Sequence, residues 1–197
     1  MREVLLCKLC ILIMDHVDIE FLAEREHVSI IPKFNSDKMF LISGEVGPFN
    51  VGVPTEVPIW LAINLKQRNE CQIQRPTWME LVTLETMKED ESNSELFTPL
   101  PSPYFQEISH ILLNQATDNI PHADGIRTII KDILDIRVAK LRSSIDKFVK
   151  LKATYAKLDN LSQMEINTVR AFLTTALDHM RNLDKTEKLT EQYASVN

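Results

Sequence analysis

The sequence predicts an α+β protein in which a small β-rich N-terminal domain precedes a larger all-helical domain built on a long antiparallel helical hairpin. Glycine and proline separate short apolar runs before residue 76, and glycine then almost disappears. After residue 122, two long stretches carry apolar residues at steps of three and four. Such steps place one apolar stripe along each helix, whereas closely spaced glycine and proline are typical of short strands and turns.

The first part of the chain carries the signals of a small mixed domain. We expect a short helix with Val17, Phe21 and Leu22 on one side, followed by strands at 28–31 and 39–42. Proline suits the first turn of a helix, so a second helix is expected to open at a proline. The remaining expected elements are a loop at 44–54, a helix from Pro58 through Leu65 and a strand at 71–74.

Beyond residue 76 the pattern is helical. A capping-box signature at 77–80 predicts the start of a helix with Leu81, Leu84 and Met87 on its apolar face. We expect this helix to fade into a solvated acidic loop at 89–93.

The predicted hairpin occupies residues 123–183, with its connection at 157–161 and a second capping box at 162–165. Ser102 and Pro103 are expected to open the helix that precedes it, as N-cap and first helical residue. The spacing of the apolar residues predicts that both hairpin helices bury one stripe.

Shifts in composition divide the chain. The apolar run at 4–14 is too short to span a bilayer, lacks a small-residue cleavage site and is followed at once by acidic residues. We therefore expect it to be an extension upstream of a start at Met14 rather than a secretion signal. The predicted segments are an apolar extension at 1–13, a β-rich domain at 14–75, a helical domain at 76–183 and a disordered tail at 184–197.

The charge distribution separates the two halves of the chain. Residues 1–121 hold 9 Lys and Arg against 18 Asp and Glu, whereas residues 122–197 hold 13 against 10. An acidic front and a mildly basic back suit docking onto other proteins better than wrapping a duplex. Three cysteines without a repeated spacing argue against a disulfide framework, so we expect a reducing compartment.

Motifs for catalysis are missing from the sequence. The five histidines fall in five different segments, and none has a second metal ligand at helical spacing. No Gly-x-Ser-x-Gly motif occurs, and Cys71 lies on an expected strand without a recognisable histidine partner. We predict no enzymatic activity, no metal and no cofactor. The competing hypothesis, an active site of scattered residues near the loop at 44–54, would require a small-molecule ligand.

Basic residues gather along the second half of the first hairpin helix, where Asp146 is the only acid between residues 137 and 157. One interpretation is a solvated face whose cations suit the negative end of a helix. The other interpretation is a contact with DNA, which would be weak because few aromatic residues are present there to stack on bases. This interpretation gives our alternative function, a helical adaptor that binds nucleic acid. The candidate basic contact face consists of Arg137, Lys140, Arg142, Lys147 and Lys150.

Eight sequence blocks share their order and spacing with one known family. They are EFLAE at 20–24, GPF at 47–49, VPIWLAINLK at 57–66, PSPY at 101–104, DNIP at 118–121, AKLR at 139–142, LDNL at 158–161 and MEIN at 164–167. Together they resemble the Psf-two subunit of the eukaryotic GINS complex. The resemblance runs from about Met14 to Leu183, and residues 1–13 depart from the family pattern.

The resemblance implies a non-catalytic role in chromosomal DNA replication. GINS is a heterotetramer of four related subunits, so the other three subunits are the implied direct partners, and the nucleus is the implied compartment. The complex joins the MCM hexamer and a RecJ-like cofactor to form the replicative helicase, and it helps to connect the helicase to the leading-strand polymerase. No membrane contact is implied.

Two helices with wide apolar stripes would expose a large hydrophobic patch in a lone chain, and such patches normally mark protein interfaces. We therefore expect the hairpin and the helix after Ser102 to pack against sister subunits. The candidate interface residues are Tyr104, Phe105, Ile108, Ile126, Ile130, Ile133, Leu141, Ile145, Phe148, Phe172, Leu173 and Leu177.

Overall fold

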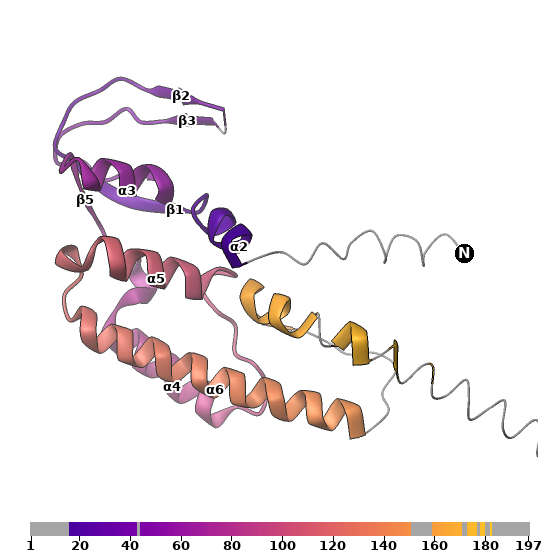
Figure 1. Ribbon diagram of the computed structural model, residues 1–197. Coiled ribbons are helices and arrows are strands. Elements are labelled where there is room, and N and C mark those ends of the chain that lie inside the picture. The colour runs from indigo at the N-terminus through magenta and orange to yellow at the C-terminus, as the bar shows by residue number, and fades with distance from the viewer. Residues whose placement is uncertain are drawn as a thin grey trace, which may run out of the picture.

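The computed structural model describes residues 16–42, 44–150, 159–170, 173–176, 178–179 and 182. The predicted extension at 1–13, the predicted tail at 184–197 and residues 157–158 of the predicted connection lie outside the described residues. Within the described chain the predicted α+β class is confirmed, because a small part that contains all the described strands comes first and a larger helical part follows (Figure 1).

The β-rich part contains two small antiparallel sheets. β1 is the central strand of the first sheet and pairs with β4 on one side and β5 on the other, while β2 and β3 form a separate hairpin that projects from the rest of the protein (Figure 1). The strands are β1 (His27–Pro32), β2 (Met39–Leu41), β3 (Gly44–Val46), β4 (Thr55–Pro58) and β5 (Cys71–Ile73). The helices of this part are α2 (His16–Ala23) and α3 (Ile59–Gln67).

Alternation along β1 positions the core of this part. Val28, Ile30 and Pro32 are buried and the residues between them are less so, because successive side chains of a strand point to opposite faces. α3 packs against all three strands of the sheet and buries Ile59 and Ala62. Strands of only three to six residues thus acquire a hydrophobic cover that an isolated sheet of this size would lack.

Two expectations for the β-rich part are wrong. The predicted loop at 44–54 begins with a strand, β3, which pairs with β2 so that Leu41 lies opposite Gly44. α2 buries Ile19 and Ala23, whereas Val17 and Phe21 are exposed. The reason is that α2 packs against a helix of the C-terminal half, and this contact selects the buried face.

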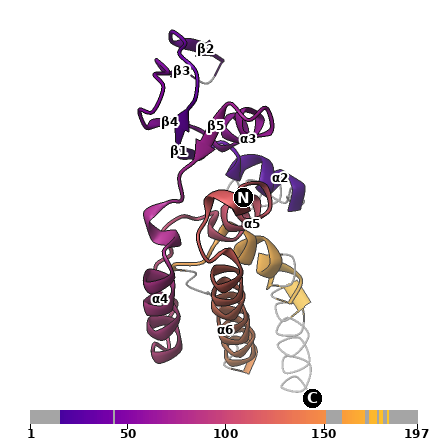
Figure 2. The ribbon, with the colours of Figure 1, turned by 90° about the vertical axis from the view of Figure 1, so that its left-hand side faces the viewer.

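The helical part begins with a short 3-10 turn, η1. Its helices are α4 (Leu81–Asn93), α5 (Phe105–Gln115) and α6 (Ala123–Lys150), and the 3-10 turns are η1 (Thr77–Met79) and η2 (Thr117–Asn119). α4 packs along α6, and Figure 2 shows the two helices side by side. α5 packs against α6 and also against α2, so it joins the two parts of the molecule.

The predicted start and end of α4 are both wrong. The capping box at 77–80 does not form: residues 77–79 are a 3-10 turn, and Glu80 receives a hydrogen bond of 3.2 Å from Arg75 instead. The predicted loop at 89–93 is the last turn of α4, because Glu91 is buried against α6 and holds that turn in the helix.

The capping box at 162–165 is present. The Ser162 amide donates to Glu165 Oε2 at 2.7 Å, and the Glu165 amide donates to Ser162 Oγ at 3.2 Å. We call the helical residues 163–170 and 173–176 that follow it the C-terminal helical segment.

The C-terminal helical segment does not run antiparallel to α6, so the hairpin prediction is wrong in this respect. An antiparallel hairpin would place Glu165 near the end of α6, yet its carboxylate pairs with Arg137 in the middle of that helix. Val169 and Leu173 then cluster with Leu141 further along α6. Both ribbon views show the segment and α6 running in the same direction (Figures 1 and 2). Apolar periodicity identifies a buried stripe but carries no information on helix direction.

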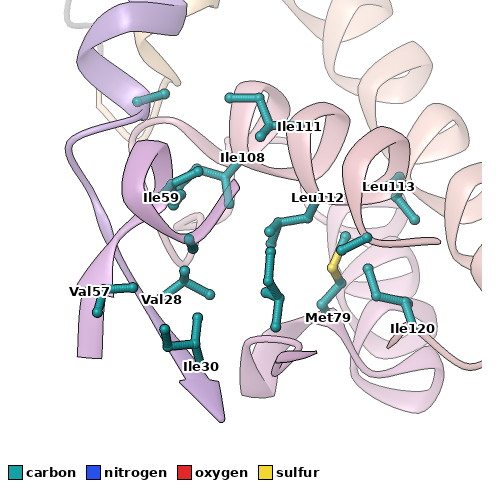
Figure 3. Close-up of a cluster of buried hydrophobic side chains, with 14 of the residues drawn as sticks. Val28, Ile30, Val57, Ile59, Met79, Ile108, Ile111, Leu112, Leu113 and Ile120 are labelled. Carbon is teal, nitrogen blue, oxygen red and sulfur yellow. The ribbon is translucent and has the colours of Figure 1, made fainter. Parts of the chain in front are cut away.

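One hydrophobic core joins the β-rich and helical parts. Figure 3 shows Val28, Ile30 and Val57 from the sheet in the same cluster as Leu112 of α5 and Met79 of η1. A hydrogen-bonded ion pair adds a polar link, since Lys66 Nζ lies 2.6 Å from Asp118 Oδ2. The boundary at residues 75 and 76 stays a prediction, but the core does not stop there.

Gly125 explains how closely α4 and α6 approach. Glycine in a helix lowers helix propensity by up to about 1 kcal/mol relative to alanine. A Cβ atom at Gly125 would lie 3.3 Å from Leu81 Cδ1, which is tighter than most such contacts. The glycine therefore makes room for the first turn of α4.

Replacing Phe105 with alanine should lower the free energy of unfolding by about 3–5 kcal/mol, since it leaves a cavity in the shared core. Phe105 is fully buried, and its ring lies 5.1 Å from that of Trp78. Phe40→Ala is the matched control, because the Phe40 side chain is 78% exposed. Urea unfolding of the full-length variants measures both effects, and equal losses would contradict this description of the core.

Candidate subunit interface

A buried guanidinium lies at the centre of the helical part. Arg137 is 0% exposed and donates to Glu165 through two hydrogen bonds, Nε to Oε1 at 2.8 Å and Nη2 to Oε2 at 2.9 Å. Nη2 also donates to the Asn160 carbonyl at 2.7 Å, and Nη1 donates to the Thr98 carbonyl at 3.2 Å. The planar guanidinium can therefore join three segments that are distant in the sequence.

Glu91 of α4 completes this arrangement. Its Oε2 accepts from Arg137 Nη1 at 3.0 Å, from the Thr98 amide at 3.1 Å and from the Thr98 hydroxyl, while Oε1 accepts from Lys140 Nζ at 2.7 Å. We call Glu91, Thr98, Arg137, Lys140 and Glu165 the Arg137 cluster. Buried charges are tolerated only when they are paired and hydrogen-bonded, and both carboxylates here meet that condition.

The Arg137 cluster corrects the predicted basic contact face. Arg137 is enclosed by its own chain, and Lys140 is half-buried and engaged by Glu91, so neither side chain is available to nucleic acid. Arg142, Lys147 and Lys150 are exposed and remain candidates. The nucleic-acid adaptor hypothesis thus loses two of its five cations.

Most of the predicted interface residues are also internal. Their apolar stripes are largely covered by α4, α5 and the β-rich part of the same chain, so as a set they form its core rather than an exposed apolar face. The buried members are Phe105, Ile108, Ile126, Ile130, Ile133, Leu141 and Leu173. Tyr104, Ile145 and Phe148 are half-buried, and Phe172 and Leu177 lie outside the described residues.

A different set of apolar side chains reaches the surface of the described chain. Exposed pairs occur on α2 and at the β2–β3 hairpin, and single residues occur on α4 and α6. The exposed large apolar residues are Val17, Phe21, Phe40, Ile42, Val51, Val53, Val82, Leu96 and Val138. Clustered exposed apolar side chains are typical of protein contacts, and the sequence placed Val17 and Phe21 on one side of a helix without showing that this side is exposed.

The described residues offer little for catalysis. The Cys71 thiol is buried and donates to the Ala62 carbonyl at 3.6 Å, and burial raises the pKa of this thiol. A raised pKa keeps the sulfur in the unreactive thiol form. In the part of the chain that the structure describes, no three potential metal ligands lie together and no helix is long and apolar enough to cross a bilayer.

Comparison with known proteins identifies this architecture. The family model for the PSF2 N-terminal domain matches residues 15–74, and the model for the GINS complex protein helical bundle domain matches residues 78–184. The human "DNA replication complex GINS protein PSF2" is 57% identical over 170 residues, which cover 86% of this chain and 92% of the human protein.

More distant relatives show the same coverage. The "Probable DNA replication complex GINS protein PSF2" of Drosophila melanogaster is 42% identical over 183 residues, covering 93% of this chain and 90% of its own. The Schizosaccharomyces pombe relative is 36% identical over 166 residues, covering 84% and 88%. A β-rich part followed by a helical bundle places the protein among the GINS complex subunits. The chain belongs to the PSF2 family.

Replacing Arg137 with methionine should lower the free energy of unfolding by about 3–5 kcal/mol, because it leaves the carboxylates of Glu91 and Glu165 buried without their shared partner. Lys147→Met removes an exposed cation of the same helix and should change stability by less than about 0.5 kcal/mol. Unfolding the two variants in denaturant, monitored by circular dichroism, measures the difference between their free energies of unfolding. A loss for Arg137→Met no larger than that for Lys147→Met would contradict the proposed importance of the cluster.

The Arg137 cluster should also make stability fall in acid. Burial tends to raise the pKa of Glu91, but hydrogen bonds from Lys140 and Thr98 and the charge of Arg137 outweigh it and hold the pKa below the ordinary 4.5. Below pH 4.5, Glu91 therefore takes up a proton in the unfolded chain while it stays ionised in the folded chain. The contribution of Glu91 to the free energy of unfolding is fully present above pH 4.5 and is lost as the pH falls through the pKa of the folded state. Glu91→Gln should flatten the acid side of the stability profile, and parallel profiles would contradict the assignment.

Proposed function

We propose that this chain is a non-catalytic subunit of a GINS heterotetramer, acting in the initiation and elongation of chromosomal DNA replication in the nucleus. The observation that carries the proposal is the match of both PSF2-family segments, at residues 15–74 and 78–184, with 57% identity to the human relative. The three other GINS subunits are the direct partners. The MCM hexamer and the RecJ-like cofactor join through the assembled complex to form the replicative helicase, which links to the leading-strand polymerase.

The architecture is suited to a scaffold. A single core fixes the β-rich part on the helical part, so the chain presents its surfaces in one arrangement. Little mobility between parts lowers the entropic cost of association, because fewer groups must be ordered on binding. A subunit of this kind can stabilise a closed helicase assembly by contacting that state better than the separated components.

The surfaces left free by the chain's own packing are the ones we assign to partners. Tyr104, Ile145 and Phe148 retain exposed area beside the internal core and are candidates for sister-subunit contacts. Arg142 and Lys147 present exposed cations that suit an acidic partner surface. We also propose that residues 14–75 and 76–183 correspond to the two structural domains of the subunit.

Co-expression with the three presumed sister subunits tests this function. Size-exclusion chromatography with light scattering should show a soluble complex with one copy of each subunit, because the complementary surfaces of the four subunits become buried when they assemble. The same chain produced alone is the control, and it should aggregate or be less stable than the chain in the complex. A well-behaved monomer that does not co-elute with the other three subunits would contradict the proposal.

A further inference from the structure

A cavity of about 440 Å³ lies where α2, α5 and α6 meet. Its apolar wall is made by Leu113 of α5 together with Ile130 and Leu134 of α6. The acidic and basic side chains around it are Glu20 and His16 of α2, Glu107 and His110 of α5, and Arg127 and Lys131 of α6. Neither the replication role nor the family match assigns a ligand to this cavity.

Glu107 is the unusual member of the cavity lining. Its side chain is 3% exposed, and neither carboxylate oxygen has a hydrogen-bond partner among the described residues. Burial raises the pKa of this carboxyl more than the residue's own backbone amide and the neighbouring His16 lower it, and the nearby charges of Glu20 and Glu165 raise it slightly further. A place in the first turn of α5 favours a negative charge there, but a helix terminus contributes only about 0.3–1 kcal/mol. Glu107 is therefore a buried polar group without a partner in the described part of the chain, where such a group would usually be paired.

Among the described residues, no cation pairs with Glu107. Arg127 Nη2 donates to the Leu113 carbonyl at 3.2 Å and is directed to the C-terminal end of α5. Lys131 is exposed on α6. Within the described structure, the cavity thus combines a buried hydrogen-bond acceptor, an apolar wall and empty volume.

The surface beside the cavity suits a protein. Val17 and Phe21 are 67% and 63% exposed, and each directly follows a cavity-lining residue of α2, His16 or Glu20. Successive helical residues are about 100° apart, so these two apolar side chains face outward next to the cavity mouth. A free ion would leave them in water, whereas a partner surface would cover them while one of its side chains enters the cavity.

We infer that the cavity receives an arginine or lysine side chain of an adjoining subunit, which pairs with Glu107 as the same surface covers Val17 and Phe21. The aliphatic stem of such a side chain fits the wall of Leu113, Ile130 and Leu134, and its charged end supplies the donors that Glu107 lacks. This inference rests on the proposed assembly with sister subunits. It also gives a physical reason for a buried carboxylate that weakens the lone chain.

The experiment measures how fast the assembled tetramer exchanges this subunit for a fluorescently labelled wild-type copy. Glu107→Gln keeps the shape of the side chain but removes its charge, and should speed exchange by about 30-fold or more, as expected when one member of a buried ion pair is lost. Phe21→Ser alters only an exposed position and should speed exchange by about tenfold. Glu85→Gln, at an exposed glutamate of α4, is the control and should leave the rate unchanged.

Thermal unfolding of the lone full-length chain supplies the second measurement. Glu107→Gln should leave its melting temperature unchanged or raise it, because the charge is unpaired before assembly. Wild-type exchange rates for both Glu107→Gln and Phe21→Ser in an intact tetramer would overturn the inference and leave the proposed function standing. Destabilisation of the lone chain by Glu107→Gln would also overturn it, since Glu107 would then be paired within its own chain. Failure of the wild-type chain to assemble would overturn both.

Discussion

The ion pairs of Arg137 constrain how the helices of this protein can pack. One guanidinium contacts Glu91 of α4, the Asn160 carbonyl and Glu165 of the C-terminal helical segment. These contacts fix the end of α4 and the start of the C-terminal helical segment against the middle of α6. Hydrophobic stripes alone would tolerate a shift of one helical turn, but a buried charge set would not, because the shifted carboxylates would be left unpaired. The cluster therefore specifies register and direction.

The same chain contains a second buried carboxylate with the opposite character. Glu91 accepts hydrogen bonds from Arg137, from Lys140 and from both the amide and the hydroxyl of Thr98, whereas Glu107 has no partner among the described residues. The pKa of Glu91 is accordingly lowered by its partners and that of Glu107 is raised by burial. One carboxylate stabilises the folded chain at neutral pH and the other weakens it. This contrast separates an internal structural site from a site available to another protein.

The shared core determines which surfaces a GINS assembly can use. The sheet packs into the same hydrophobic cluster as α5 and α6. The apolar stripes that the sequence predicts as interfaces are therefore largely buried within the chain. The surfaces that remain outside this core are the exposed side of α2, the projecting β2–β3 hairpin and the exposed cations near the end of α6, and we propose these for partner contacts. Membership of the PSF2 family and this distribution are consistent with the scaffold that we propose.

The sequence by itself determined the α+β class, the strands at β1 and β5, the start of α6 at residue 123 and the capping box of residues 162–165, because these depend on local periodicity and local hydrogen bonds. It also carried an unused signal: Arg137 lies four residues after Ile133 and four before Leu141, in the middle of a buried stripe. Only the tertiary structure decided the parallel direction of the C-terminal helical segment, the burial of Arg137 and Glu91, and the exposed face of α2. Those features arise from contacts between residues far apart in the sequence, such as Arg137 and Glu91, which are 46 positions apart, and local patterns do not encode such contacts.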